Sequence, residues 1–488
     1  MNNNFIIVNN PKDWDFDIPG VEVIEAREYC LGGEKFLNKK GMRIFNLCRS
    51  YRYQAMGYYV SLIASARGHK AFPDINTIQE IKAPQLVRIL TEDIDRLIQK
   101  SLENVSTKTF ILSIYFGKNI SKIYDRLSRE LYNLFQAPML RAHFTKKNNQ
   151  WMIQNIDVIS GNQIPDEHRP YIIDNAFQYF SRDFSRKRKK TLPPYDMAIL
   201  TSGNDPTPPS DKKAINHFIK AADNNGFDVK IIGKDSPQRI AEFDALFIRE
   251  TTAVNHHTFR LAQKAAAQGL VVIDDPDSII KCTNKVYLAE LLKYNKLPVP
   301  GSTVLIKDSV KQISSDCKFP LILKRPDSSY SNGIIKVENR DDFLEKAGIL
   351  FEKSDLLIAQ EYMRTDFDWR VGVFDGKPIY ACKYYMAKDH WQIINWKEKG
   401  KKRTGVHETV ALENTPKNVV QTALKACKCI GNGLYGVDIK QIKNKCYIIE
   451  VNDNPSIDSD VEDAAYGDAL YDSIMKVFYQ RVRQQKER

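Results

Sequence analysis

Short apolar runs and amphipathic stretches alternate through the middle of the chain. The apolar runs are rich in β-branched residues and read MAILTS, FDVKIIG, DALFIRE and LVVIDD. Stretches with helical spacing, such as SDKKAINHFIKAADNNG, separate them. This alternation predicts a parallel, Rossmann-like layer that binds ligands at the carboxyl ends of its strands. Arg249 and Glu250 fall at such an end, where Arg249 would either meet a ligand or form a structural ion pair.

Apolar and polar residues alternate one by one near the C-terminus, in YGVDIKQIKNKCYIIEVNDNP (435–455). This alternation predicts an antiparallel hairpin that turns at about Asn444. If the turn is symmetric there, Asp438 lies opposite Glu450, and Asn452 shares their face. Facing carboxylates repel unless a cation lies between them, and oxygen ligands favour Mg²⁺ or Mn²⁺ over zinc. A solvated hairpin face is the alternative, and strand pairing alone does not decide between the two.

A third pattern lies between these regions, in FPLILKRPDSSYSNGIIKVEN. An apolar strand delivers Lys324, a loop of small and hydroxylated residues follows, and a second strand begins at Ile334. Such a loop can bind phosphates through its N–H groups and hydroxyls. It lacks both GxxxxGK[ST] and GxGxxG, so on its own it is a weak signal for phosphate binding and favours a plain hairpin turn. Further on, a strand ends in QEYM, whose backbone could pair with an adenine edge.

The first block of the chain is less regular. The segment MRIFNLCRSYRYQAMGYYVSLIASARGHK predicts a strand followed by an amphipathic helix that ends at Gly68. A basic, proline-containing stretch, SRKRKKTLPPYD (185–196), separates this block from the alternating region.

Composition narrows the class of protein only in part. The net charge of +12 suits nucleic acid, an anionic surface or small anionic ligands, and does not choose among them. The eight cysteines show neither a CxxC pair nor a zinc spacing, which favours a reduced, cytoplasmic setting. No segment approaches the roughly 20 apolar residues of a membrane span. We therefore expect a cytoplasmic enzyme or binding protein that does not associate with membranes.

The order of these patterns resembles the ATP-grasp fold. Lysine strand, small-residue loop, QEYM, the DxR of TDFDWRVGVF and the D…ExN hairpin follow one another, and GLYGVDIK and IIEVNDNPSID are most similar to the RimK-like carboxylate-amine ligases. The likeness covers about residues 195–479, and the block before it looks like the amino-terminal domain of one RimK-like subfamily. It implies a mixed α/β and α+β fold. The expected parts are an α+β N-terminal domain at 1–190, a Rossmann-like pre-ATP-grasp domain at 191–283, and a two-lobed ATP-grasp domain at 284–488 with its small lobe at about 301–362 and its large lobe at about 363–488.

The resemblance also implies three groups of site residues. Its ATP-binding positions fall on Lys285, Lys324, Ser329, Ser331, Asn332, Gly333, Gln360, Glu361, Tyr362 and Asp368. Its metal ligands fall on Asp438, Glu450 and Asn452, which would hold two Mg²⁺ or Mn²⁺ ions. Its basic catalytic positions fall on Arg370, Lys383 and Arg403. The phosphate loop departs from the family's more glycine-rich version, which leaves open which of its atoms contact ATP.

The implied reaction joins a carboxylate to an amine. The carboxylate takes the γ-phosphoryl group of ATP, and an amine attacks the acyl phosphate to form an amide. The expected partners are ATP and an amino acid such as glutamate, with a peptide, protein or small amino compound as the second substrate, and we expect a homo-oligomer. Two alternatives remain: an ATP-grasp kinase that stops at phosphorylation, and a non-catalytic nucleic-acid-binding or scaffold protein. The intact metal and lysine positions count against the last.

Two physical expectations follow from the sequence. Because Asp438 and Glu450 are expected to hold a cation, Asp438→Asn or Glu450→Gln should abolish ATP turnover. Relief of the repulsion between the two carboxylates should leave the ligand-free fold as stable or more stable. The segment HWQIINWKEKGKKRTGVH (390–407), rich in glycine and basic residues, is expected to be a mobile lid.

Overall fold

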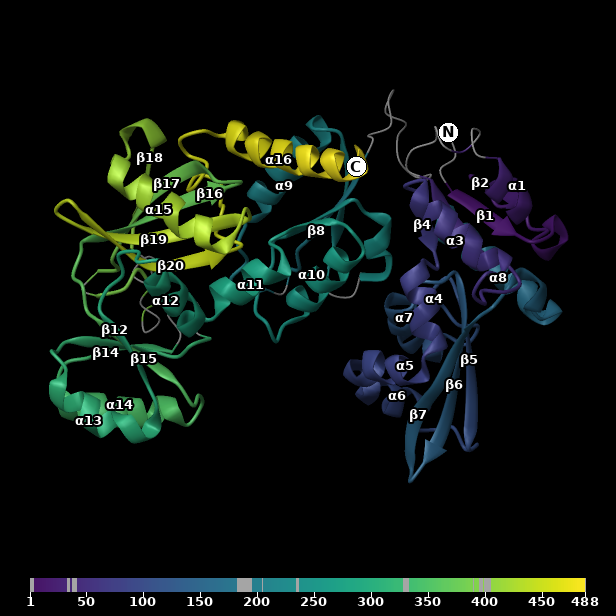
Figure 1. The fold of residues 1–488 in the computed structure, drawn as a ribbon, viewed down its shortest axis with the longest axis horizontal. Coiled ribbons are helices and arrows are strands. Elements are labelled where there is room, and N and C mark those ends of the chain that lie inside the picture. The colour runs from purple at the N-terminus through teal and green to yellow at the C-terminus, as the bar shows by residue number, and fades with distance from the viewer. Residues whose placement is uncertain are drawn as a thin grey trace. The chain divides into compact units, whose positions relative to one another are not determined.

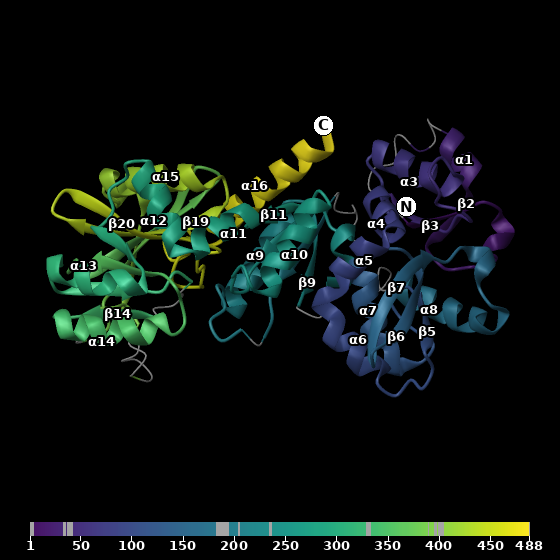
Figure 2. The same cartoon turned by 60° about the horizontal axis from the view of Figure 1, so that its bottom comes forward.

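The computed structural model describes residues 4–32, 36, 42–181, 195–203, 205–233, 237–327, 333–388, 390–394, 398 and 405–487. The chain forms two compact units, Met1–Pro194 with Asp235–Glu242, and Tyr195–Lys234 with Phe243–Arg488 (Figures 1 and 2). The domain limits expected from the sequence stay a prediction.

The first unit contains two sheets. The parallel sheet has the order β2-β1-β3-β4, with β1 at Asn4–Val8, β2 at Val21–Glu25, β3 at Arg43–Asn46 and β4 at Lys70–Phe72. The antiparallel sheet has the order β5-β6-β7, with β5 at Thr109–Tyr115, β6 at Met139–Lys147 and β7 at Gln150–Val158. The helices are α1 (Ala26–Leu31), α3 (Met56–Ala66), α4 (Ile75–Lys82), α5 (Pro84–Thr91), α6 (Asp95–Leu102), α7 (Asp125–Leu134) and α8 (Arg169–Ser181).

The expected helix of the first block is α3, which ends just before Gly68 at φ +68°. A residue in this left-handed conformation is usually glycine, because a Cβ atom would clash with the backbone. Hydrophobic periodicity therefore found this element correctly, although the parallel sheet around it was not anticipated.

The second unit opens with the predicted parallel layer. Its order is β11-β10-β8-β9, with β8 at Tyr195–Leu200, β9 at Phe227–Ile232, β10 at Ala245–Ile248 and β11 at Val271–Ile273. The accompanying helices are α9 (Lys212–Asn224), α10 (His257–Ala267), α11 (Pro276–Thr283) and the C-terminal α16 (Asp468–Glu487), which packs against α9. The parallel pairing confirms the expectation from the alternating pattern.

Two antiparallel sheets follow in the same unit. The smaller has the order β12-β15-β13-β14, with β12 at Ser302–Leu305, β13 at Leu321–Lys324, β14 at Ile334–Val337 and β15 at Leu357–Glu361. Helices α13 (Val310–Asp316) and α14 (Arg340–Phe351) cover one of its faces (Figure 1), where Leu323, Val337 and Phe343 form a buried core. The alternate residues Ile322, Lys324 and Ile358 point to the opposite face of this sheet and are also buried, each no more than 7% exposed.

The larger sheet has the order β18-β17-β16-β19-β20. Its strands are β16 (Phe367–Phe374), β17 (Lys377–Tyr385), β18 (His407–Val410), β19 (Leu434–Ile442) and β20 (Lys445–Asp453). Helices α12 (Lys285–Tyr294) and α15 (Lys417–Ile430) pack against one face of this sheet and share a buried core with Val371, Val437 and Val451 of its strands. The side chains one residue away on each strand point to the opposite face. No helix among the described residues combines the length and the apolar character needed to span a membrane.

Candidate active site

The β19–β20 hairpin carries the three predicted metal ligands. Its turn is at Lys443 and Asn444, and the strands pair regularly from Ile442 opposite Lys445 to Ile439 opposite Ile448. The register then shifts, so that Asp438 lies opposite Glu450. The predicted pairing is confirmed, but a symmetric turn does not produce it.

A β-bulge at Ile449 produces the pairing instead. Without the extra residue, Asp438 would lie opposite Ile449, and Glu450 would point to the other face of the sheet. With it, Asp438 and Glu450 are directly opposite, and Gly436 lies opposite Asn452. The bulge therefore gathers the three polar side chains on one face.

Arginine and lysine side chains neutralise both carboxylates. Arg370 on β16 binds Asp438 through two hydrogen bonds, of 2.8 Å from Nε and 2.9 Å from Nη2. Lys285, at the start of α12, forms a hydrogen-bonded ion pair with Glu450. The repulsion expected between Asp438 and Glu450 is thus offset by cations of the protein itself. These ion pairs argue against the expectation that removing either charge leaves the ligand-free fold as stable or more stable, and that expectation stays a prediction for experiment to decide.

The same three side chains fit a hard divalent cation. Their side-chain oxygen atoms come from two carboxylates and one amide, which is the donor chemistry that Mg²⁺ and Mn²⁺ prefer. Asn452 Nδ2 lies 3.3 Å from Asp438 Oδ2, so the amide is already held beside one of the carboxylates. The roles of these residues as metal ligands stay a prediction.

Lysine side chains converge on the carboxylate face. Lys324 at the end of β13 is 7% exposed, and burial lowers its pKa to about 8 although the Glu450 charge opposes the shift. Burial raises the pKa of Glu450, but the ion pair with Lys285 and the charge of Lys324 lower it more, so that the pKa is below the ordinary value of a glutamate. Lys285 and Lys440 add to the positive field at Lys324. A site with this much positive charge is suited to phosphate groups.

Lys440 is a site residue that sequence reasoning missed. Its Nζ lies 2.6 Å from Asp368 Oδ1, where Asp368 is the predicted ribose ligand. Burial raises the pKa of Asp368, while Lys440 opposes that shift. The signal was present in the sequence, because Lys440 stands two residues after Asp438 and so shares its face of the strand.

Lys383 is not brought to this face. It lies opposite Trp369 on β16, one residue before Arg370, and therefore points to the other side of the sheet. Its Nζ is 3.1 Å from Glu408 Oε1 and 5.4 Å from the centre of the Trp369 ring. The expected place beside the reacting carbonyl is corrected by this alternation, which places Tyr384 rather than Lys383 on the face of Arg370.

The predicted adenine hinge lies at the end of β15. Gln360 pairs with Ser302 and Ile322 inside the small sheet, and the Glu361 amide donates to Gly301 O at 2.7 Å. Tyr362 follows, with Lys336 Nζ 4.3 Å from the centre of its ring. Because the Glu361 amide is already bonded, the Tyr362–Met363 segment beyond the strand is better placed to offer backbone groups to a base.

The predicted phosphate loop lies between β13 and β14 in the sequence. Its base is closed by a hydrogen bond from Arg325 N to Gly333 O at 3.1 Å, and Gly333 has φ +82°. The remaining expected positions Ser329, Ser331, Asn332 and Arg403 lie outside the described residues, as does much of the expected lid at 390–407.

Arg249 has a structural role. It is fully buried, and its guanidinium donates to Asn454 Oδ1 at 2.8 Å and to Ser210 Oγ at 2.8 Å. Burial lowers its pKa to about 10. Asn454 Nδ2 in turn donates to Glu250 O at 2.7 Å. Arg249 thus connects the loop after β20 to the carboxyl edge of the parallel layer, which is a structural role, but through hydrogen bonds to neutral groups rather than through the expected ion pair.

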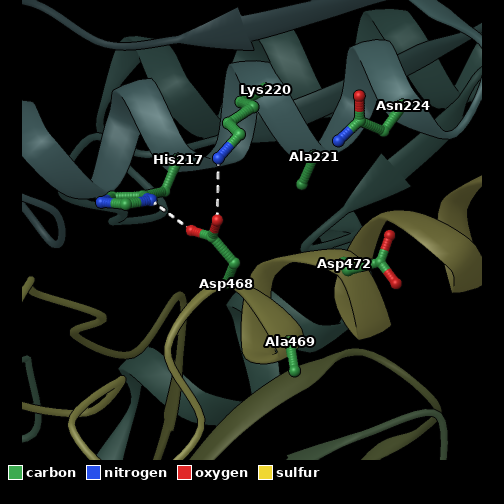
Figure 3. A pocket seen from close by; sticks show the side chains of 7 residues that line it. All are labelled: His217, Lys220, Ala221, Asn224, Asp468, Ala469 and Asp472. Carbon is green, nitrogen blue, oxygen red and sulfur yellow. Dashed lines mark hydrogen bonds and ion pairs between the residues drawn. The ribbon is translucent and has the colours of Figure 1, made fainter.

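A depression between α9 and α16 lies apart from these residues. Figure 3 shows His217 and Lys220 pointing to Asp468, at 2.7 and 2.8 Å. None of the predicted site residues lines this depression. His217 and Lys220 bond to Asp468 across the interface between the two helices, so the depression belongs to the packing of α16 against α9.

The arrangement in the second unit defines an ATP-grasp enzyme. Residues 282–456 match the family model described as an ATP-grasp domain, and residues 26–175 match the RimK-like ATP-grasp N-terminal domain. The chain therefore combines a RimK-like ATP-grasp N-terminal domain with an ATP-grasp domain, as ATP-dependent carboxylate-amine ligases do.

Curated relatives agree with this assignment. A protein named "Probable alpha-L-glutamate ligase" from Histophilus somni strain 129Pt is 23% identical over 232 residues, covering 47% of this chain and 75% of that protein. "Alpha-aminoadipate--LysW ligase LysX" from Saccharolobus solfataricus is 24% identical over 219 residues, covering 43% of this chain and 75% of that protein.

Two solved structures align with more than half of this chain. D-alanine--D-alanine ligase from Bacillus anthracis gives a TM-score of 0.48 at 17% identity, over 60% of this chain and 99% of that one. A RimK domain ATP-grasp protein from Sphaerobacter thermophilus gives 0.45 at 14% identity, over 58% and 98%.

Proposed function

We propose that the chain activates a carboxylate with ATP as an acyl phosphate and adds an amino acid with an acidic side chain, such as glutamate, to a peptide, protein or small amino compound. The observation that carries this proposal is the single face on which Asp438, Glu450 and Asn452 meet Arg370 and the lysines around Glu450. This observation supports the proposal because phosphoryl transfer from a nucleotide uses carboxylates to hold a metal ion and cationic side chains to bind the phosphates.

Each group of residues has a distinct task in this proposal. Lys285 and Lys324 would bind the phosphates, and in doing so would release Glu450 from its ion pair with Lys285. Asp438, Glu450 and Asn452 would then hold Mg²⁺. When bound, Mg²⁺ neutralises charge on the β- and γ-phosphate oxygens and aligns the transfer.

Arg370 is proposed to act on the reacting carbonyl group. Its side chain lies on the metal-ligand face, and its guanidinium carbon is 5.1 Å from the centre of the Tyr384 ring. A fixed guanidinium stabilises the oxyanion that forms as the amine attacks, an effect of about 3 kcal/mol per donor.

The acidic substrate is inferred from the relatives. The two named relatives act, by their names, on L-glutamate and α-aminoadipate, which are both amino acids with an acidic side chain. The formal charge of +12 on this chain is compatible with anionic substrates in general. A place in the cytoplasm, where ATP is available, also fits this proposal.

The test is product analysis by mass spectrometry. The full chain is incubated with ATP, Mg²⁺, a panel of amino acids and cell extract, and an amide with ADP and free phosphate is expected. Hydroxylamine in place of the amine should trap the activated acid as a hydroxamate. Glu450→Gln is the inactive control, since it alters a proposed metal ligand.

Two results would replace the proposal. ADP formed together with a stable phosphorylated product, without free phosphate or an amine requirement, would show a kinase. Salt-dependent RNA binding without ATP turnover would show a nucleic-acid-binding protein.

A further inference from the structure

A second group of potential metal ligands lies at the carboxyl edge of the parallel layer. Glu250 follows β10, and His256 and His257 stand at the start of α10. Each of the three offers a ligand atom, and these atoms lie within 4.8 Å of one another. We call this group the Glu250 cluster.

We propose that the Glu250 cluster binds a divalent transition metal ion of the zinc class, separately from the Mg²⁺ of the ATP site. Two imidazoles and one carboxylate favour zinc and its neighbours, whereas Mg²⁺ prefers oxygen ligands and retains water. Nothing in the proposed ligase reaction uses these three side chains.

Burial gives the first argument for the cluster. Glu250 is 5% exposed, and its Oε2 has no hydrogen-bond partner among the described residues. A buried carboxylate oxygen without a partner costs free energy, and a metal ion would satisfy it.

The spacing of the ligand atoms gives the second argument. Glu250 Oε1 lies 3.0 Å from His257 Nε2. Two atoms bound to one tetrahedral zinc ion at about 2.0–2.1 Å are separated by about 3.3 Å. Glu250 and His257 are therefore already close to the spacing that a shared ion requires, and the ligand atom of His256 lies within 4.8 Å of theirs.

The tautomer of His256 gives the third argument. The Thr258 hydroxyl donates to Thr251 O at 3.2 Å, so its oxygen can accept a hydrogen bond from His256 Nδ1, 3.0 Å away. This arrangement favours the tautomer with its ring proton on Nδ1, in which the Nε2 lone pair can bind a metal. Histidine ligands in metal sites are commonly oriented in this way by a hydrogen bond at the other ring nitrogen.

The cluster is tied to the loop that follows the predicted metal ligands of the ATP site. Asn454 Nδ2 donates to Glu250 O, and the Thr252 hydroxyl donates to Asp453 Oδ2 at 2.6 Å. Asp453 directly follows Asn452. A metal ion in the cluster would therefore stiffen this loop, and with three protein ligands it would keep a position open for water or an anionic substrate group.

Cobalt spectroscopy tests the proposal directly. The full chain is stripped with chelator and titrated with Co²⁺ in excess Mg²⁺, and one equivalent should give saturable visible absorption that Zn²⁺ abolishes. His256→Ala and His257→Ala should each weaken Co²⁺ binding by more than about 10-fold, since even changes outside the ligand set cost about 10- to 100-fold.

Matched controls separate this site from the rest of the molecule. His217→Ala removes a histidine that also contacts a carboxylate, Asp468, and should leave Co²⁺ binding unchanged. Asp438→Asn alters the proposed Mg²⁺ site and should also keep the Co²⁺ absorption, even if the ligase proposal fails.

Two outcomes would overturn the proposal. The first is the absence of saturable Co²⁺ absorption, or its persistence in folded His256→Ala and His257→Ala variants. The second applies to the wild-type chain, whatever the stability of the variants: X-ray absorption of the zinc-loaded protein should show two imidazole ligands, and a shell of oxygen atoms alone would leave Glu250 and His257 as an ion pair only.

Discussion

Asp438→Asn is expected to destabilise the ligand-free protein. Asp438 and Arg370 have side chains only 14% and 19% exposed, and two charge-assisted hydrogen bonds join them. Removing one partner of a buried ion pair typically costs about 3 to 5 kcal/mol. Asparagine keeps one oxygen that can accept from Arg370, so we expect a loss of about 2 to 3 kcal/mol in the free energy of unfolding.

The assay is urea unfolding of the full chain without nucleotide or metal, followed by intrinsic fluorescence. Glu487→Gln is a suitable control, because its ion pair with Arg483 is about half exposed on both sides and joins residues four apart on one helix. Such a pair contributes about 0.3 to 0.5 kcal/mol. The two variants differ in what surrounds the lost charge, while the chemical change is the same.

The result that would refute this reasoning is an Asp438→Asn protein as stable as the wild type, or more stable. Repulsion between Asp438 and Glu450 would then outweigh the bond to Arg370, as the sequence alone suggested. A double-mutant cycle with Arg370→Met locates the effect, since the cost of Asp438→Asn should largely disappear when the guanidinium is absent.

Three further predictions rest on the same face and its surroundings. Lys324 has a pKa of about 8 in the folded protein and an ordinary value of 10.5. Between these two pH values the unfolded chain binds more protons than the folded one, so the free energy of unfolding should rise by roughly 3 kcal/mol as the pH increases from 8 to 10.5. Urea titrations at several pH values measure this rise, and Lys324→Met should abolish it. Lys383→Met should change the initial rate of ATP turnover by less than about threefold, whereas Arg370→Met should reduce it by about 100-fold or more. If both variants lose the same fraction of the rate, Lys383 does take part in the active site. Gly436→Ala should lower the free energy of unfolding by about 1 to 3 kcal/mol, because the added Cβ would lie 2.7 Å from Pro455 Cβ. An unchanged urea midpoint would show instead that the loop containing Pro455 can move aside at no cost in stability.

Much of the fold could be predicted from local pattern. The alternation of short apolar runs with helical stretches gave the parallel layer of β8 to β11, and period-two alternation gave the β19–β20 hairpin with its turn near Asn444. These elements follow from side-chain periodicity, which is a property of neighbouring residues. The fold of the first unit was harder to predict from the sequence. Its strands β1 to β4 have five residues or fewer, and their parallel pairing joins segments that are distant in the chain.

Only part of the candidate site could be predicted in this way. Asp438 and Asn452 followed from alternation, and Lys440 could have been found by the same rule. The faces of Arg370 and Lys383 could not, because each depends on which residue of a neighbouring strand lies opposite, and that register is set by the sheet as a whole.

The sequence by itself determined the elements, their order and the residue types available for the site. Tertiary structure alone decided the partners: Lys285 meets Glu450 across 165 positions of the chain, and Arg249 meets Asn454 across 205. It also decided that Ile449 is the extra residue of the bulge, which turns Glu450 to the face of Asp438. The physical reason is that strand alternation is local, whereas register and charge pairing depend on burial and contacts that exist only once distant segments have packed together.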